Sequence, residues 1–102
     1  MQWTFADNCR DGRGAQLRFF DLTHGGFWPA DPTQVFAVQD DGVSKFATLT
    51  CVPSARICYG AEPNPTDGSV YWGAGLEGTM SCDACCATCG NGNPPPISLV
   101  CN

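Results

Sequence analysis

The stretch AQLRFFDLT, residues 15–23, has the pattern of a β-strand that is covered on both sides. Leu17 and Phe19 share one face of such a strand, because successive side chains point to opposite faces. Phe20 and Leu22 fall on the other face, together with Arg18. Bulky side chains on both faces predict a central strand of a sheet.

Short apolar stretches recur on either side of this strand, with turn-forming residues between them. Further strands are expected at residues 3–5, 34–39, 44–51, 56–59, 69–72 and 97–101. The clearest hairpin joins residues 34–39 to residues 44–51 through Asp40, Asp41 and Gly42, since glycine can adopt the positive φ of a tight turn. The leading core candidates are Leu17, Phe19, Phe36, Val38, Leu49, Ile57, Val70 and Leu99.

The remaining segments favour turns and loops. Prolines interrupt residues 27–32 and 62–68, which we expect to be irregular. Residues 73–96 are rich in Cys, Gly and Pro and predict a long loop before the last strand, in which only residues 82–89 would tolerate a helical turn. The sequence therefore predicts an all-β fold, a small antiparallel β-sandwich of about seven short strands in a single domain, residues 1–102.

The composition is typical of small extracellular domains. The chain has 102 residues, of which 43% are hydrophobic and only 15% are charged, and it contains eight cysteines. Domains too small for a large core commonly rely on disulfides in oxidising compartments. The net charge of −5 argues against nucleic acid as a partner, because that affinity depends on clustered Lys and Arg. No apolar run approaches the roughly 20 residues of a membrane-spanning helix.

The start of the chain bears on the compartment. No secretory signal precedes Trp3, and a Met1 that replaces a cleaved signal would fit a secreted protein. A native Met1 would instead fit a cytoplasmic protein. Because of the cysteine content, we expect a secreted or extracellular location.

Half of the cysteines lie in the segment SCDACCATCG, residues 81–90, as overlapping Cys-x-x-Cys pairs. Such pairs can bind zinc, but structural zinc sites normally combine two pairs from separate segments, whereas here the second pair is adjacent. A redox-active pair would need a helix N-terminus on a βαβ sheet, and the sequence shows no such unit. The zinc alternative has four candidate ligands: Cys82, Cys85, Cys86 and Cys89.

Disulfides are the favoured interpretation, because an even number of cysteines can pair completely. The candidates are Cys9, Cys51, Cys58, Cys82, Cys85, Cys86, Cys89 and Cys101. Cys85 and Cys86 are not expected to join each other, since disulfides favour Cα atoms about 4.4 to 6.8 Å apart and adjacent Cα atoms are about 3.8 Å apart. We expect each clustered cysteine to bond an outlying one, which would hold residues 73–96 against the sandwich.

Candidate catalytic residues are few. His24 is the only histidine, and it lies in a turn with Gly25 and Gly26, close in sequence to Asp21. A histidine base needs a nucleophile, and the disulfide interpretation leaves no free thiol. We therefore expect a turn histidine and a protein that is not an enzyme.

Two carboxylate pairs, Asp7 with Asp11 and Asp40 with Asp41, are expected to cap their own turns. Neither pair has the Asp-x-Asp-x-Asp-Gly order of a helix–loop–helix calcium site. Only the acidic surplus favours a loop calcium ion, so the sequence predicts no cofactor apart from zinc in the alternative above.

Exposed aromatic side chains could bind a glycan, because their flat faces stack on sugar rings. Trp28, Trp72 and Tyr59 are the candidates, although core packing is the more common role of such residues. Trp28 is the best exposed candidate, because it lies in the irregular stretch of residues 27–32. Tyr71 and Trp72 are consecutive on an expected strand, so they should point to opposite faces.

These observations predict a secreted, disulfide-stabilised module without enzymatic activity, which binds a partner or has a structural or assembly role. The partner would be a protein, a second copy of the chain included, or a glycan. The alternative is an intracellular protein that binds zinc through residues 82–89.

Overall fold

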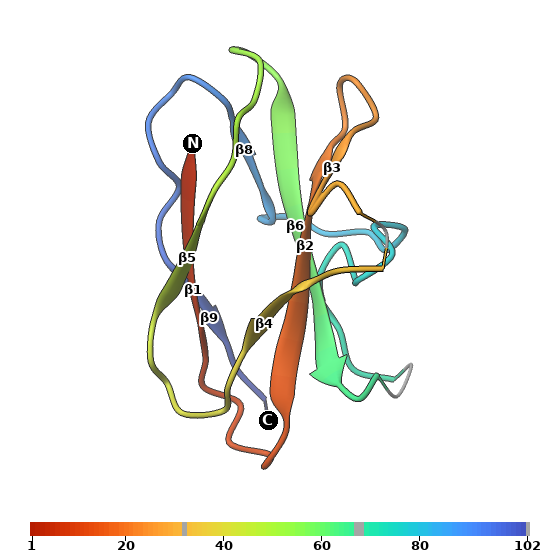
Figure 1. The fold of residues 1–102 in the computed structure, drawn as a ribbon, viewed down its shortest axis with the longest axis vertical. Helices are drawn as coiled ribbons and strands as arrows, with labels where there is room; N and C mark the ends of the chain where they lie inside the picture. Colours follow the sequence, from red (N-terminus) through yellow and green to blue (C-terminus); the bar gives the residue numbers. More distant parts are fainter. Residues whose placement is uncertain (32, 67–68, 102) are drawn as a thin grey trace.

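The computed structural model describes residues 1–31, 33–66 and 69–101. This part of the chain forms nine short strands in two sheets that lie face to face (Figure 1). The strands are β1 (Gln2–Asp7), β2 (Gly14–Asp21), β3 (Phe27–Trp28), β4 (Phe36–Val38), β5 (Lys45–Thr48), β6 (Arg56–Asn64), β7 (Trp72–Gly73), β8 (Cys86–Thr88) and β9 (Ile97–Leu99). None of the described residues is helical, so none belongs to a helix that could cross a membrane. The all-β prediction is confirmed.

The two sheets differ in size and in pairing. One has the order β5-β1-β9, and the other follows β3-β2-β6-β7, with β4 also paired to β2 and β8 to β6. Among the described strands every pair is antiparallel except β1–β9, which is parallel. Two strands were not expected: β3 lies in residues 27–32 and β8 in residues 73–96, both predicted to be irregular. In addition, β6 continues into residues 62–68, which were predicted to be a loop.

The central position of β2 is confirmed. It pairs with β6 over its full length and with β3 and β4 along its other edge. Leu17 and Phe19 are fully buried between the sheets. On the opposite face, Phe20 is half-buried, and a Cβ on Gly78 would meet its ring at 2.8 Å. The loop that contains Gly78 therefore covers the outer face of the larger sheet, to the right of β2 and β6 in Figure 1.

Phe19 is the centre of the core between the two sheets. Its ring centroid lies 5.2 Å from that of Trp3 and 6.2 Å from that of Phe5, both on β1. Phe36 on β4 packs edge-on against it at 5.5 Å, and Tyr59 on β6 packs against Trp3 at 6.1 Å. Of the core candidates, Leu17, Phe19, Val38, Leu49, Ile57 and Leu99 are buried, whereas Phe36 and Val70 are half-buried.

The expected hairpin between residues 34–39 and 44–51 is wrong. Its first strand, β4, pairs with β2, and its second strand, β5, pairs with β1 in the other sheet. The chain therefore crosses from sheet to sheet between them (Figure 1). Gly42 does have a positive φ of 71°, but this conformation is compatible with a connection between two sheets as well as with a hairpin turn.

Backbone hydrogen bonds hold this crossing against the loop that follows β1. The carboxylate of Asp40 accepts the N–H groups of Arg10 and Gly12 at 2.7 and 2.8 Å. The N–H of Gly42 donates to the carbonyl oxygen of Asp7 at 3.0 Å. These bonds give residues 40–42 partners other than β4 or β5, which is why the turn does not close a hairpin.

Replacing Phe19 by alanine should destabilise the fold strongly, because the cavity would lie where the two sheets meet. We expect Phe19→Ala to lower the free energy of unfolding by about 3–5 kcal/mol. The matched control is Phe46→Ala, which removes the same ring from a side chain that is 67% exposed. The control should cost less than about 0.5 kcal/mol. Guanidinium unfolding of the oxidised protein measures both, and equal losses would contradict this account of the core.

Candidate functional site

All eight cysteines form disulfides. The four bonds join Cys9 to Cys101, Cys51 to Cys89, Cys58 to Cys86 and Cys82 to Cys85. Disulfides persist in oxidising compartments, and small domains that carry several of them are typical of the extracellular space. The chain is thus a disulfide-rich small β-domain of the kind found in extracellular modules.

The expectation that each clustered cysteine bonds an outlying one holds for Cys86 and Cys89 and is wrong for Cys82 and Cys85. These last two residues are three positions apart and bond each other within one loop. Cys85 and Cys86 do not join, as expected, although their Sγ atoms lie 3.6 Å apart. The four clustered sulfurs belong to three different disulfides, which leaves no thiolate for the zinc alternative.

Cys9 and Cys101 pair because of strand register. In the parallel pair β1–β9, Asp7 lies opposite Leu99. Cys9 lies two residues after Asp7, and Cys101 lies two residues after Leu99. The two cysteines therefore lie opposite each other just beyond the paired strands. The Cα atoms are 4.7 Å apart. No local sequence signal indicates this parallel pairing. For this reason a bond between two outlying cysteines was not expected.

The structure does not bring the three candidate aromatic residues together. Trp28 lies opposite Phe19 in the β2–β3 pair and is half-buried, so it is not the exposed platform that was expected. Tyr59 is half-buried against Trp3, and burial raises the pKa of its hydroxyl. Trp72 is half-buried as well, and its Nε1 donates to the carbonyl oxygen of Val100 at 3.0 Å.

An open hollow of about 340 Å³ lies beside Trp72, and we call it the Tyr71 hollow. Its lining residues are Ser69, Val70, Tyr71, Trp72, Val100 and Cys101. Tyr71 is 43% exposed and Val100 is 59% exposed, whereas Trp72 packs against the core. The expectation that Tyr71 and Trp72 point to opposite faces stays a prediction, because Tyr71 precedes β7 and both residues line the hollow. Tyr71 is an aromatic residue more exposed than Trp28, and the choice of Trp28 missed it.

A second cleft, of about 280 Å³, lies where β8 approaches the proline-rich segment before β9. Trp3, Tyr59 and residues 94–98 form much of its lining. The indole N–H of Trp3 is buried without a hydrogen-bond partner. Trp3 is only 2% exposed, so a partner of the size of a sugar or a peptide side chain cannot reach this N–H without moving its cover.

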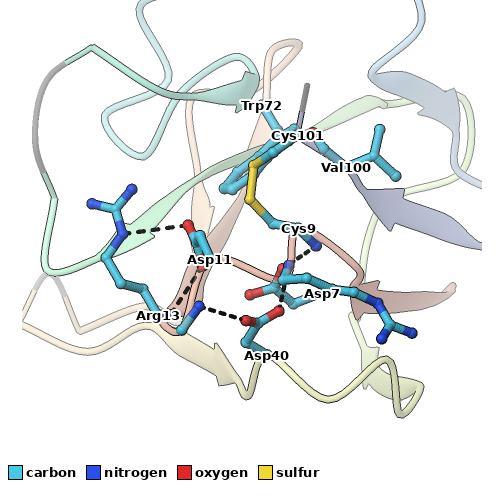
Figure 2. The surroundings of a disulfide bond; sticks show 10 residues. Asp7, Cys9, Asp11, Arg13, Asp40, Trp72, Val100 and Cys101 are labelled. Atoms are coloured by element: carbon cyan, nitrogen blue, oxygen red, sulfur yellow. Dashed lines mark hydrogen bonds and ion pairs between the residues drawn. A yellow bond between two sulfur atoms is a disulfide. The ribbon is translucent and has the colours of Figure 1, made fainter.

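Three carboxylates converge beside the Cys9–Cys101 disulfide (Figure 2). One oxygen from each of Asp7, Asp11 and Asp40 lies within 4.8 Å of the other two. Asp7 Oδ1 accepts the N–H of Cys9 at 3.0 Å, whereas Oδ2 is buried without a partner. Burial raises the pKa of Asp7, the N–H of Cys9 partly offsets this, and repulsion by Asp40 adds to it.

Asp7 caps its own turn, as expected, because its Oδ1 accepts the N–H of Cys9, but the side chain is also buried, with 1% exposure. The signal that could have shown this is the alternation of β1. Trp3 and Phe5 face the core, and Asp7 is the next residue on the same face. Asp41, the other expected partner of Asp40, is not part of the cluster and accepts the N–H of Val43 instead.

His24 lies in an exposed turn after β2, as expected. Its Nδ1 is 3.0 Å from Oδ2 of the buried Asp21, and Oδ1 of Asp21 accepts the N–H groups of Thr23 and His24 at 2.9 Å each. Burial on its own would raise the pKa of Asp21, but the hydrogen bonds from His24 and Thr23 outweigh it and lower the pKa. Asp21 therefore holds the turn as an ionised cap.

No protein-family model, no curated protein and no solved structure matches this chain.

Removing the Cys51–Cys89 bond should cost more stability than removing the Cys82–Cys85 bond, because it closes the longer loop. With the Cys58–Cys86 bond intact, the loop closed by Cys51–Cys89 contains about ten residues, and loop-closure entropy predicts losses of about 2.7 and about 1.5 kcal/mol for the two bonds. Double alanine variants of each pair, unfolded in guanidinium under oxidising conditions, measure the losses. Similar losses for both pairs would show that loop entropy does not set these contributions.

Asp21→Asn should weaken the fold at pH 7 and have less effect in acid. A carboxylate whose pKa is lowered by folding stabilises the folded state above its unfolded pKa of about 3.9, and this contribution is lost as the pH falls below that value. Urea unfolding of both proteins between pH 2.5 and 7 should give stabilities that converge in acid. The exposed Asp83→Asn variant controls for the change in net charge, and a pH-independent difference for Asp21→Asn would contradict this role.

Proposed function

We propose that this chain is a secreted, non-enzymatic binding module that contacts its partner through the Tyr71 hollow. The observation that carries the proposal is the exposure of Tyr71 and Val100 on the border of one concave surface. Exposed aromatic and apolar residues that gather in a concave site are typical of ligand contacts.

The hollow is held in shape by covalent and hydrogen bonds. Cys101 forms one border and is bonded to Cys9, which anchors the end of β9 to the end of β1. Trp72 Nε1 donates to the carbonyl of Val100, which links the two chain segments on either side of the hollow. A site that is ordered before binding loses little conformational entropy when it binds.

The chemistry of the hollow suits a glycan or a protein side chain. The ring of Tyr71 offers a flat apolar face with a hydroxyl at one edge, which can stack on a sugar ring and hydrogen-bond to it. Val100 adds an apolar contact that either class of partner could cover. The acidic chain, with a net charge of −5, disfavours polyanionic partners.

The absence of enzymatic activity is part of this proposal. The ring of His24 is hydrogen-bonded to Asp21, and within the described residues no Ser, Thr or Cys side chain bonds to it. Every cysteine sulfur is part of a disulfide. A base without a nucleophile in reach favours a structural role for the Asp21–His24 pair.

A structural or assembly role is the second candidate, and β5 favours it. This strand lies at the edge of the three-stranded sheet, and its Phe46 is 67% exposed. An edge strand can add a strand from a second copy of the chain. Phe46 would then be covered in the assembly.

Two variants distinguish these roles, and each is the control for the other. If the Tyr71 hollow binds a glycan, Tyr71→Ala should weaken binding about five- to thirtyfold on an oligosaccharide panel, since an aromatic contact contributes roughly 1–2 kcal/mol. Phe46→Ala should leave that binding unchanged. Affinities are measured by calorimetry on the panel members that bind.

Self-association is measured by sedimentation velocity on the same proteins. Dimers that Phe46→Ala disrupts and Tyr71→Ala leaves intact would support the assembly role instead. Dimers that only Tyr71→Ala disrupts would identify a second copy as the partner of the hollow. If Tyr71→Ala changes neither glycan binding nor association, the hollow is not the binding site.

A further inference from the structure

The carboxylate cluster of Asp7, Asp11 and Asp40 contains a buried group that the fold leaves unsatisfied. Asp7 is 1% exposed, and its Oδ2 has no hydrogen-bond partner. A buried carboxylate oxygen without a donor or a cation is costly. The core does not require a carboxylate here, because a neutral side chain of the same size would fill the position.

The other two carboxylates are fixed in place facing Asp7 (Figure 2). Both oxygens of Asp40 accept backbone N–H groups, from Arg10 and Gly12. Asp11 Oδ1 accepts the N–H of Arg13, and its Oδ2 lies 3.3 Å from Arg13 Nε. Each of these oxygens keeps a second lone pair that can bind a cation.

The separations fit one ion of the size of calcium. Calcium binds oxygen at about 2.3–2.6 Å, so two of its ligands can be up to about 5 Å apart. The three ligand oxygens lie within 4.8 Å of one another. Magnesium keeps several of its waters and is usually bound through one or two carboxylates, so a site with three carboxylates favours calcium. The side chain of Asp11 is 22% exposed, which leaves one side open for water to complete the six to eight oxygens that calcium requires.

We propose that Asp7, Asp11 and Asp40 bind a calcium ion that joins the end of β1, the loop after it and the crossing between β4 and β5. The ion supplies the partner that Asp7 Oδ2 lacks and neutralises the repulsion among the three carboxylates. The partial pairing of Asp11 with Arg13 and the need for several waters imply a dissociation constant of about 0.1–1 mM, the range of extracellular calcium modules. This inference does not depend on the Tyr71 hollow.

Calcium titration followed by amide NMR tests the site directly. The amides of Cys9, Arg10 and Gly12 donate to the ligand carboxylates, so they should show the largest saturable shifts. Asp11 is exposed, and Asp11→Asn should fold normally while binding calcium at least about tenfold more weakly. The matched control is Asp41→Asn, which removes the same charge next to Asp40 but outside the cluster, and it should bind within about twofold of the unchanged chain.

Thermal unfolding provides the second measurement. Calcium at tenfold excess over its dissociation constant should raise the Tm by about 7 °C, and a chelator should reverse the increase. Asp7→Asn should abolish the increase while keeping the remaining amide spectrum. Shifts that do not saturate, equal effects of magnesium, or equal weakening by Asp11→Asn and Asp41→Asn would overturn the proposal.

Discussion

The packing of Phe19 on β2 against Trp3 and Phe5 on β1 joins the two sheets, and the rest of the structure follows from it. Because side chains alternate along a strand, a β1 that turns Trp3 and Phe5 to the core must also turn Asp7 inward. The burial of this carboxylate is thus a consequence of the same register that forms the core. The buried carboxylate of Asp7 therefore results from the packing of an aromatic core that the two sheets share.

Two of the four disulfides lie in register with the strand pairing. Cys58 and Cys86 are register partners on β6 and β8, and the Cys9–Cys101 bond continues the parallel pair β1–β9. The Cys51–Cys89 bond links the segment after β5 to the segment after β8, and so joins the two sheets. The Tyr71 hollow is lined in part by Cys101, and the carboxylate cluster lies beside the same disulfide, Cys9–Cys101 (Figure 2). Both proposed sites therefore depend on a covalent link that the register places there.

Prediction from sequence succeeded where apolar residues alternate along a strand over enough positions to be recognised. The eight residues of β2 gave a clear alternation, and its central position and buried face were predicted correctly. The two- and three-residue strands β3 and β8 carry no such period, because they exist only through pairing with β2 and β6. The hairpin at residues 34–51 was wrong because its turn residues bond to the loop after β1, which is distant in sequence.

The sequence by itself determined the all-β class, the central strand, most of the core and the dependence on disulfides. Each of these follows from local alternation or from composition, which a single chain displays directly. Only the tertiary structure decided which strands pair, which cysteines bond, and that Asp7, Asp11 and Asp40 meet. The physical reason is that these contacts join segments far apart in the chain, and burial of both sheets in one core selects among pairings that each segment alone would allow.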